Sequence, residues 1–319
     1  MTVHLPIVSV SELRAYRRCQ RLHQLSYGMR YRSVDKKGPR RFGSAWHRAL
    51  EVYFAPATCG DVDAALASID VDGEIDPYER AKCRAMILGY HARWGAADLE
   101  ILAVEVHFRA PLVNPATGRE SFTRQLGGQI DVIVRTPDGR TWIMEHKSTS
   151  EDVSISGNYW RKLRMDAQLS TYFVGARGLG YECAGAMYDA ARKPGLKPYK
   201  KTENIRLKKD GTPYANTRLE DETPEEYEAR CVAAIAEDPD AYLHRGIVTR
   251  SAEEMREAAA DTWDTVRMMR ESELAGRFPR NDAGCEYMHQ MCDFFDVCTG
   301  FASLDDTSLF RVVPREDKS

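Results

Sequence analysis

The sequence lacks any long hydrophobic run. No apolar stretch in its 319 residues approaches the roughly 18 to 20 residues that a membrane-spanning helix needs. Residues 1–6 lack the basic and apolar regions of a signal peptide. These absences predict a cytoplasmic protein with no membrane partner. In that reducing setting the eight cysteines are not expected to form disulfides, so clustered cysteines indicate metal binding or catalysis.

The phosphate-binding motif G-x-x-x-x-G-K-[ST] and internal repeats are also missing. The missing motif argues against a built-in ATP-driven motor, and it leaves room for a separate helicase or recombination protein as a partner. The cysteines also lack the C-x₂₋₄-C spacing that zinc fingers favour.

The chain has little net charge: its 45 Lys and Arg and 48 Asp and Glu give a formal net charge of −3. The distribution is uneven, however: the first 50 residues carry eleven Lys and Arg against Glu12 and Asp35. Such clusters can hold a phosphate backbone by releasing counterions, although a solvated charged surface is an open alternative. A second basic stretch, opposed only by Glu203, comprises Arg192, Lys193, Lys197, Lys200, Lys201, Arg206, Lys208 and Lys209.

The first half of the chain changes from a helical to a strand-like pattern. Ser9 and Glu12 have the spacing of a capping box, and the apolar residues after them predict a helix over about 10–27. Further helices are expected over 42–54 and 76–94, and β-rich runs predict a meander of strands over 101–108, 128–135 and 140–147.

The second half of the chain is predicted to contain both helices and strands, with a basic insertion between them. Residues 192–222 are basic, rich in turn residues and without period, which predicts an exposed insertion. The other expected elements are a helix over 158–178, a strand over 183–189, a helix over 224–236, a strand over 242–250 and a helix from Ser251 to about Leu274, followed by an irregular segment.

Acidic residues interrupt the predicted meander. Asp131 lies within an apolar strand, and Glu145 and Lys147 stand two residues apart on the next strand, hence on one face. Mg²⁺ prefers such oxygen ligands, and a nearby ammonium can orient or help to deprotonate an attacking water. This is phosphodiester-cleavage chemistry, although a buried Asp with a surface Glu/Lys pair is an equally simple interpretation of these three residues alone.

Two helices contribute further candidates. His47 lies one helical turn before Glu51 and can supply an imidazole to a metal if its helix packs beside the meander, although a lone helical His is usually structural. Gln168 and Tyr172 share an i,i+4 face on the helix after the meander, where they can contact a base or phosphate.

Taken in order, these pieces resemble the RecB-like branch of the PD-(D/E)XK nucleases, specifically the iron–sulfur exonucleases related to CRISPR-associated RecB-like nucleases and to the AddB nuclease domain. The resemblance spans most of the chain. One departure is Gln20, where the family commonly has Pro after its first cysteine. The motifs that carry it are Ser11-x-Leu13-x-x-Tyr16-x-x-Cys19, Gly43-x-x-x-His47-x-x-Leu50-Glu51, Gly128-x-x-Asp131, Glu145-x-Lys147, Gln168-x-x-x-Tyr172 and the terminal cysteines.

The resemblance implies an α/β fold with a restriction-endonuclease-like core, in which helices flank a mixed central sheet. It implies that His47, Asp131, Glu145 and the main-chain carbonyl of His146 bind Mg²⁺ or Mn²⁺. Lys147 would be the catalytic lysine, and Gln168 and Tyr172 would lie beside the DNA path.

Cysteines gather near the end of the chain. The spacing Cys285-x₆-Cys292-x₅-Cys298 leaves iron–sulfur, zinc and unliganded thiols open. The resemblance implies a [4Fe–4S] cluster in which Cys19 is the fourth ligand. The other four, which we expect to be ordinary buried thiols, are Cys59, Cys83, Cys183 and Cys231.

We therefore expect a Mg²⁺- or Mn²⁺-dependent DNA exonuclease that acts on single strands or DNA ends in recombination, repair or CRISPR-related processing, encoded by a bacterium or phage. The rivals are a catalytically silent iron–sulfur nucleic-acid-binding module and a zinc-stabilised scaffold that binds an acidic protein. The expected nuclease domain spans 1–319. It comprises a helical part over 1–100, a catalytic sheet and helix over 101–191, the basic insertion over 192–222 and an iron–sulfur part over 223–319.

Overall fold

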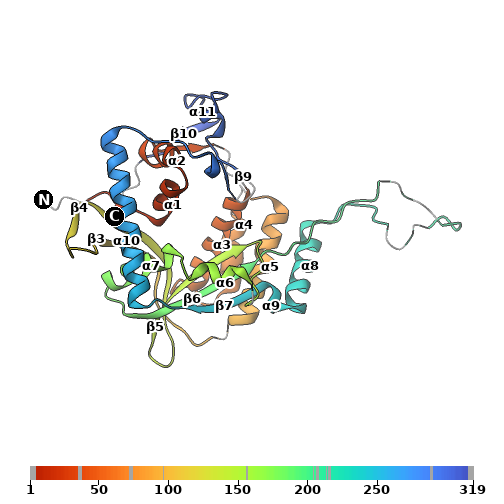
Figure 1. The fold of residues 1–319 in the computed structure, drawn as a ribbon. Helices are drawn as coiled ribbons and strands as arrows, with labels where there is room; N and C mark the ends of the chain where they lie inside the picture. The colour runs from red at the N-terminus through yellow and green to blue at the C-terminus, as the bar shows by residue number, and fades with distance from the viewer. Residues whose placement is uncertain are drawn as a thin grey trace.

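A mixed β-sheet lies between two layers of helices (Figure 1). Strands β3, β4 and β5 form the predicted antiparallel meander, β6 is parallel to β5, and β7 is antiparallel to β6. The short strand β1 pairs with the beginning of β4. The bounds are β1 Ile7–Val8, β3 Glu100–Val113, β4 Glu120–Arg135, β5 Thr141–Thr149, β6 Cys183–Arg192 and β7 Leu243–Val248.

The computed structural model describes residues 5–34, 38–71, 75–95, 97–155, 157–203, 205, 208–212, 214, 217–287 and 290–314. Within these ranges no helix has both the length and the apolar character needed to cross a bilayer. Lys36, Lys37 and Arg206, which belong to the basic stretches, lie outside them.

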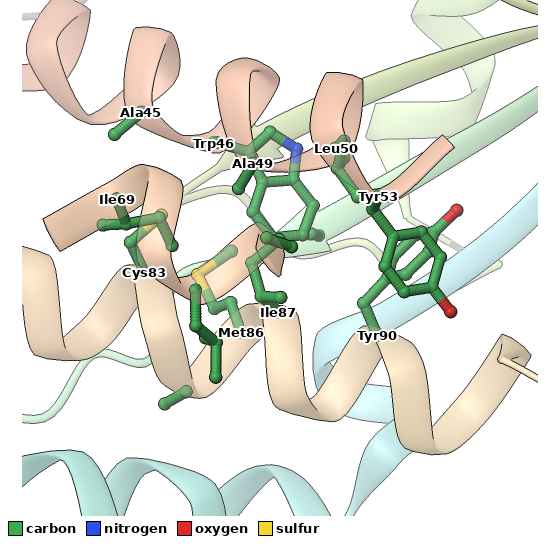
Figure 2. Packing of buried hydrophobic residues seen from close by; sticks show 14 of the residues in the cluster. Ala45, Trp46, Ala49, Leu50, Tyr53, Ile69, Cys83, Met86, Ile87 and Tyr90 are labelled. Carbon is green, nitrogen blue, oxygen red and sulfur yellow. The ribbon is translucent and has the colours of Figure 1, made fainter. Parts of the chain in front are cut away.

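One face of the sheet packs against α3 (Gly38–Phe54), α4 (Val62–Asp70), α5 (Pro77–Trp94) and α8 (Pro224–Glu237). Figure 2 shows how large side chains fill the space between α3 and α5, where Trp46 and Tyr90 meet edge to face at 6.1 Å. Each such fully buried side chain contributes roughly 1.5 to 3 kcal/mol. Gly89 lets α8 approach closely, because a Cβ there would lie 2.6 Å from Ile235.

The opposite face packs against α1 (Val10–Arg18), α6 (Asn158–Leu163), α7 (Ala167–Gly178) and α10 (Ala252–Ala275). As predicted, Ser251 caps α10, where it forms a reciprocal capping box with Glu254. Because α7 packs mainly over β3 and β4 and also contacts β5, its side chains can reach residues on this face of the meander.

Two of the predicted helices are interrupted. The helix expected over 10–27 breaks at Cys19, whose extended backbone (φ −164°, ψ 121°) separates α1 from α2 (Gln20–His23) and a π-helical turn, η1 (Gln24–Gly28). The helix expected over 158–178 is divided into α6 and α7 because Asp166 caps a new start. In each case a continuous apolar pattern hid a local backbone break.

The last 45 residues contain short elements, so the irregular segment predicted there is only partly right. Strand β10 (Phe310–Val312) pairs with β2 (Tyr31–Ser33), which joins the two ends of the described chain. The helix α4 was not predicted. The remaining short elements are α9 Pro239–Tyr242, η2 Asp282–Gly284, β8 Glu286–Tyr287, β9 Gln290–Met291 and α11 Phe295–Thr299.

Candidate active site

Three carboxylates lie in one line across β3, β4 and β5, and we call Glu105, Asp131 and Glu145 the acidic row. Asp131 is one step beyond the pair Val132–Met144, which places Glu145 opposite it on β5. Glu105 lies between the pairs Val104–Val132 and Val106–Ile130, which places it opposite Asp131 on β3. Directly opposed residues on neighbouring strands project from the same face, so the sheet register brings the three side chains together.

Asp131 is held from both sides. Its Oδ2 accepts a hydrogen bond from the backbone N–H of His146 at 2.9 Å, and it lies 3.5 Å from Nδ1 of His47 on α3. Burial opposes ionisation of Asp131, but the imidazole of His146, whose Nδ1 lies 3.7 Å from Oδ2, and the nearby His47 and Lys147 lower its pKa to about 2. Asp131 is therefore an anion at neutral pH although it is only 7% exposed.

Glu145 is fully buried and held by two neighbours, Lys147 and Gln168. Its Oε1 pairs with Nζ of Lys147 and accepts a hydrogen bond from Nε2 of Gln168 at 2.8 Å, while Gln168 Nε2 also lies 2.8 Å from the Tyr172 hydroxyl. Its Oε2 has no hydrogen-bond partner among the described residues. Burial and the charge of Asp131 raise the pKa of Glu145 to about 8, whereas Glu145 and Asp131 raise the pKa of Lys147 despite its burial.

His47 lies with two acids. One ligand atom each from His47, Glu105 and Asp131 falls within 4.8 Å of the others, the one such group of three among the described residues. Burial lowers the pKa of His47 to about 4 against the attraction of Asp131, so its imidazole is neutral at pH 7 and has a lone pair to donate. Burial, Asp131 and Glu51 raise the pKa of Glu105 to about 8.

These residues fit a divalent cation. The acidic row sets three carboxylates against the single ammonium of Lys147, and a buried oxygen of Glu145 has no hydrogen-bond donor within the described ranges. A hard cation supplies both the missing positive charge and a partner for the Glu145 oxygen. It binds carboxylate oxygen and offsets the repulsion that raises the pKa of Glu105 and Glu145. The backbone carbonyl of His146, which follows Glu145 on β5, is a further candidate oxygen ligand for the cation.

On the other face of the sheet lies a second line of polar residues, which we call the paired row: His146, Asp189 and Arg245. The register pairs His146 with Asp189 and Asp189 with Arg245. Arg245 donates two hydrogen bonds to Asp189, at 2.6 and 2.7 Å, and the Tyr90 hydroxyl donates a third at 2.7 Å. The Tyr90 hydroxyl also lies 3.2 Å from Nε2 of His146.

The four predicted cluster cysteines line one cavity of about 380 Å³ between α2 and the C-terminal segment. Cys19 lies at the break after α1, and Cys285 follows η2. Cys292 lies between β9 and α11, and Cys298 lies within α11. Arg18 and Asn281 join the same two segments by hydrogen bonds, from Arg18 Nε to the Gly284 carbonyl at 2.7 Å and from Asn281 to the Arg18 carbonyl at 2.8 Å.

The remaining cysteines differ from the expectation that all four are buried. Cys83 and Cys231 are buried, but Cys183 is only half-buried, and Cys59 is exposed in the turn between α3 and α4. The prediction for Cys59 was wrong, because the chain leaves the helical pattern four residues earlier, at Ala55.

The basic insertion does not join the acidic row. The described part of 192–222 contains no helix or strand beyond the end of β6 and projects away from the sheet (Figure 1). Lys200 pairs with Asp221 at 3.0 Å, and between described residues no hydrogen bond or ion pair links the insertion to the carboxylates of the acidic row. Its five exposed lysines are Lys197, Lys200, Lys201, Lys208 and Lys209.

Sequence reasoning missed Glu105, Asp189, Arg245 and Tyr90. Glu105 had a visible signal, a single acid inside the apolar run from Leu102 to Phe108. Asp189 had the same kind of signal, a single acid inside the run from Cys183 to Ala191, but only the pairing of β6 with β7 brings it to Arg245.

Comparison with known proteins gives one family. The model of the PD-(D/E)XK nuclease superfamily matches residues 7–299. A similar crystal structure is that of a protein from Eubacterium rectale with a provisional exonuclease designation, at 12% identity, 92% and 93% coverage of this and that chain, and a TM-score of 0.44. Another is SSO0001, at 13% identity, 81% and 84% coverage, and a TM-score of 0.27. No curated protein matches the sequence.

Proposed function

The chain belongs to the PD-(D/E)XK nuclease superfamily, and from that premise we propose that it is a divalent-cation-dependent DNA nuclease of the RecB-like branch, acting as an exonuclease on single strands or DNA ends. The observation that carries the proposal is the acidic row with Lys147 beside it. Burial beside Asp131 raises the pKa of Glu105 and Glu145, so keeping all three carboxylates ionised at neutral pH is favourable only when a cation binds them.

The residues proposed to hold Mg²⁺ or Mn²⁺ are Asp131, Glu145 and the His146 carbonyl, with His47 on the α3 side. When bound, such a cation lowers the pKa of a coordinated water and stabilises charge on the scissile phosphate. Asp131 is suited to this role because its carboxylate is ionised and fixed by the His146 N–H.

Lys147 has a separate role in this proposal. Glu145 and Asp131 raise its pKa, so the Lys147 ammonium stays protonated at neutral pH. A protonated lysine orients the attacking water by donating a hydrogen bond, and it offsets the negative charge that develops on the phosphate.

Gln168 and Tyr172 are assigned to positioning rather than to direct DNA contact alone. The Gln168 amide bonds Glu145 Oε1, and Tyr172, which is 7% exposed, lies against the same amide. This chain of contacts fixes the Glu145 rotamer from α7, as the outer partners of a metal ligand commonly do.

Digestion of DNA tests the proposal. Labelled single- and double-stranded DNA, with 5′ and 3′ labels, is incubated with the protein in Mg²⁺, Mn²⁺ or EDTA, beside the variants Lys147→Ala and Lys162→Ala. Lys162 is a matched control because it is an exposed lysine that pairs with Glu151. We expect cleavage by wild type and Lys162→Ala in either metal, and none in EDTA or by Lys147→Ala. Equal cleavage by both lysine variants would overturn the assignment, and binding without cleavage would favour the silent binding module.

The second part of the proposal is a [4Fe–4S] cluster held by Cys19, Cys285, Cys292 and Cys298. Their shared cavity supports it, because a [4Fe–4S] cluster is held by four cysteine thiolates.

Anaerobic purification followed by iron and acid-labile sulfide analysis tests the cluster. We expect about four irons and four sulfides per chain in wild type and in the control Cys59→Ser, whose thiol is exposed and distant in the fold. Each single Cys→Ser change among the four ligands is expected to bleach the visible absorption of the cluster. Stoichiometric zinc without sulfide would overturn the proposal.

The third part assigns the basic insertion to DNA-backbone contact. Replacing its five exposed lysines with Ala should weaken binding and reduce the salt dependence, because the log–log slope on single strands falls by about 0.7 for each phosphate that is no longer neutralised. A matched control replaces Arg256, Arg267 and Arg270, exposed basic residues on α10 that pair with acids. An unchanged slope for the lysine variant would assign the DNA path to another surface.

A further inference from the structure

Another cavity, of about 470 Å³, lies beside the one that the four cysteines line, and we call it the arginine cavity. Arg280 and Cys298 line both cavities, so the two adjoin. Small-molecule sites occupy about 300 to 1,000 Å³ and combine an apolar lining with a few polar groups, which describes this cavity. The rest of its described lining is Arg21, Leu25, Met29, Val297 and Leu304.

The two arginines of this cavity carry charge that no described acid neutralises. Arg21 donates a hydrogen bond from Nη1 to Oε1 of Gln24 at 3.0 Å, and Arg280 donates one from Nη1 to the Cys298 carbonyl at 2.8 Å. Among the described residues neither guanidinium forms an ion pair, and no acid lines the cavity. Each guanidinium has five N–H donors, so both retain donors for an anion. Phosphate suits them, because a guanidinium binds it with two parallel hydrogen bonds.

The apolar wall of the cavity is part of a small hydrophobic cluster. Leu25 is 4% exposed and packs with Phe294 and Phe310, whose ring centroids lie 5.5 Å apart in a stacked arrangement. The apolar lining residues from the C-terminal segment pack against the same cluster. Met29, which is 44% exposed, marks the solvent side of the cavity. These aliphatic side chains can pack against the face of a nucleobase, but they have no donor or acceptor with which to read its edge.

An irregular backbone forms the N-terminal side of the cavity. The π-helical turn η1 contains Leu25 and ends just before Met29, whose N–H donates to the Gln24 carbonyl at 2.8 Å. Arg30 follows in the left-handed region, at φ 63°. The Arg32 guanidinium donates to the Ser26 carbonyl and so holds the turn. Single π-helical turns and left-handed non-glycine residues are frequent at functional sites, and a turn fixed in this way presents a preformed wall to a ligand.

Resting on the proposed function, we infer that the arginine cavity binds one unpaired nucleotide of the DNA strand, with its phosphate on Arg21 and Arg280 and its base against the apolar wall. A nucleotide combines the anion and the flat apolar body that the lining matches. A base inside a duplex is covered by its neighbours and by its partner, so only an unpaired nucleotide can enter. Binding of this kind tolerates any sequence and favours single strands and DNA ends.

DNA binding in EDTA tests this inference without cleavage. Fluorescence anisotropy is measured with a labelled oligothymidylate and with an abasic strand of the same length, on protein of measured iron content. Arg21→Met and Arg280→Met each remove one guanidinium, and Leu304→Trp fills the cavity while keeping both. The matched control is Arg277→Met, because Arg277 is an exposed arginine of the same segment that does not line the cavity.

We expect Arg21→Met and Arg280→Met each to weaken oligothymidylate binding about tenfold, since each loses hydrogen bonds to a charged phosphate. The log–log salt slope should fall by up to about 0.7 in each variant, the value for one phosphate on a single strand. Arg277→Met should change neither quantity. Wild type should bind oligothymidylate more tightly than the abasic strand, and Leu304→Trp should lose this preference.

Equal affinities of the three arginine variants, or equal binding of the two strands by wild type, would overturn the inference. Arg21→Met decides the outcome if Arg280→Met loses iron, because Arg21 does not line the cysteine cavity. Competition by dTMP as strong as that by oligothymidylate would make a free nucleotide, and not the strand, the ligand. The expected binding without any cleavage in Mg²⁺ would refute only the proposed function, whereas cleavage with unchanged binding in every variant would refute only the nucleotide site.

Discussion

The two faces of the central sheet carry polar rows that differ in how their charges are balanced. In the acidic row, Glu105, Asp131 and Glu145 face one ammonium, and a carboxylate oxygen of Glu145 has no partner in the part of the chain that the structure describes. In the paired row on the other face, both carboxylate oxygens of Asp189 accept hydrogen bonds from Arg245, and Tyr90 adds another. Both rows are largely buried and both cross β5.

The difference distinguishes the proposed cation site from a set of polar residues that balance their own charges. A buried ion pair that satisfies itself needs no ligand, whereas a buried set of acids either takes up protons, as the raised pKa values of Glu105 and Glu145 show, or binds a cation. His146 connects the rows, because its side chain lies beside Tyr90 and Asp189 while its backbone N–H holds Asp131. The paired row thus fixes the strand from which the acidic row is presented.

The largest expected effect comes from neutralising the acidic row. Asp131→Asn and Glu145→Gln keep the shape of each side chain but remove a proposed cation ligand. We expect cleavage to fall by about 10⁴-fold, equivalent to roughly 5.4 kcal/mol, in single-turnover assays at saturating Mg²⁺. The free energy of unfolding in EDTA should not decrease for Glu145→Gln, because the raised pKa of Glu145 reflects a penalty on its charge. For Asp131→Asn it should decrease modestly, because the lowered pKa of Asp131 shows that the fold favours its ionised form. A loss of stability equal to the loss of activity would assign these residues to folding instead.

Disrupting the paired row should instead lower the free energy of unfolding. Arg245→Met removes the cation that holds both oxygens of Asp189, which is 1% exposed, and leaves a buried carboxylate uncompensated. We expect a loss of about 3 to 5 kcal/mol in urea unfolding. The control is Arg256→Met on α10, where an exposed pair with Glu253 should cost less than about 1 kcal/mol. A cost below that of the control would show that the row is not a structural support.

The two rows also differ in how far the sequence predicted them. Asp131, Glu145 and Lys147 were found from local spacing, because alternation along one strand places Glu145 and Lys147 on one face. The antiparallel order of the meander was also predicted, since its tight turn joins strands that are adjacent in sequence. The register between β3 and β4, which identifies Glu105 as a neighbour of Asp131, was not predicted, because a propensity pattern does not determine it.

The paired row was beyond sequence reasoning for a similar reason. Asp189 and Arg245 are 56 residues apart, with the basic insertion and α8 between them. A propensity pattern predicts each strand but not which residues of two distant strands face each other. The break at Cys19 was missed because the apolar stripe continues through it, although the family resemblance groups Cys19 with the three C-terminal cysteines that line the same cavity.

A double substitution tests whether Asp189 and Arg245 of the paired row only balance each other's charge. If the paired row only balances its own charges, Asp189→Leu together with Arg245→Met should be far less costly than Arg245→Met alone. We expect the double variant to lie within about 2 kcal/mol of wild type, since replacing a whole buried pair with apolar residues is often nearly neutral. Urea unfolding of the wild type, both single variants and the double variant gives the coupling energy. An additive double variant would show that Asp189 and Arg245 act independently.

The smallest expected effect is a gain of stability in the acidic row. Burial, Asp131 and Glu51 raise the pKa of Glu105 to about 8, so the folded protein holds a proton there that the unfolded chain releases near pH 4.5. Stability therefore decreases as the pH rises from about 4.5 through 8, because ionised Glu105 is penalised only in the folded state. Glu105→Gln removes this penalty and should stabilise the EDTA-treated protein at pH 9 by on the order of 1 kcal/mol, discounted for partial exposure, with little effect at about pH 4.5. Thermal unfolding at both pH values measures the difference, with Glu100→Gln as the control. A Glu105→Gln variant that is less stable than wild type at about pH 9 would mean that the acidic row is balanced without a cation, which would remove the contrast between the two faces.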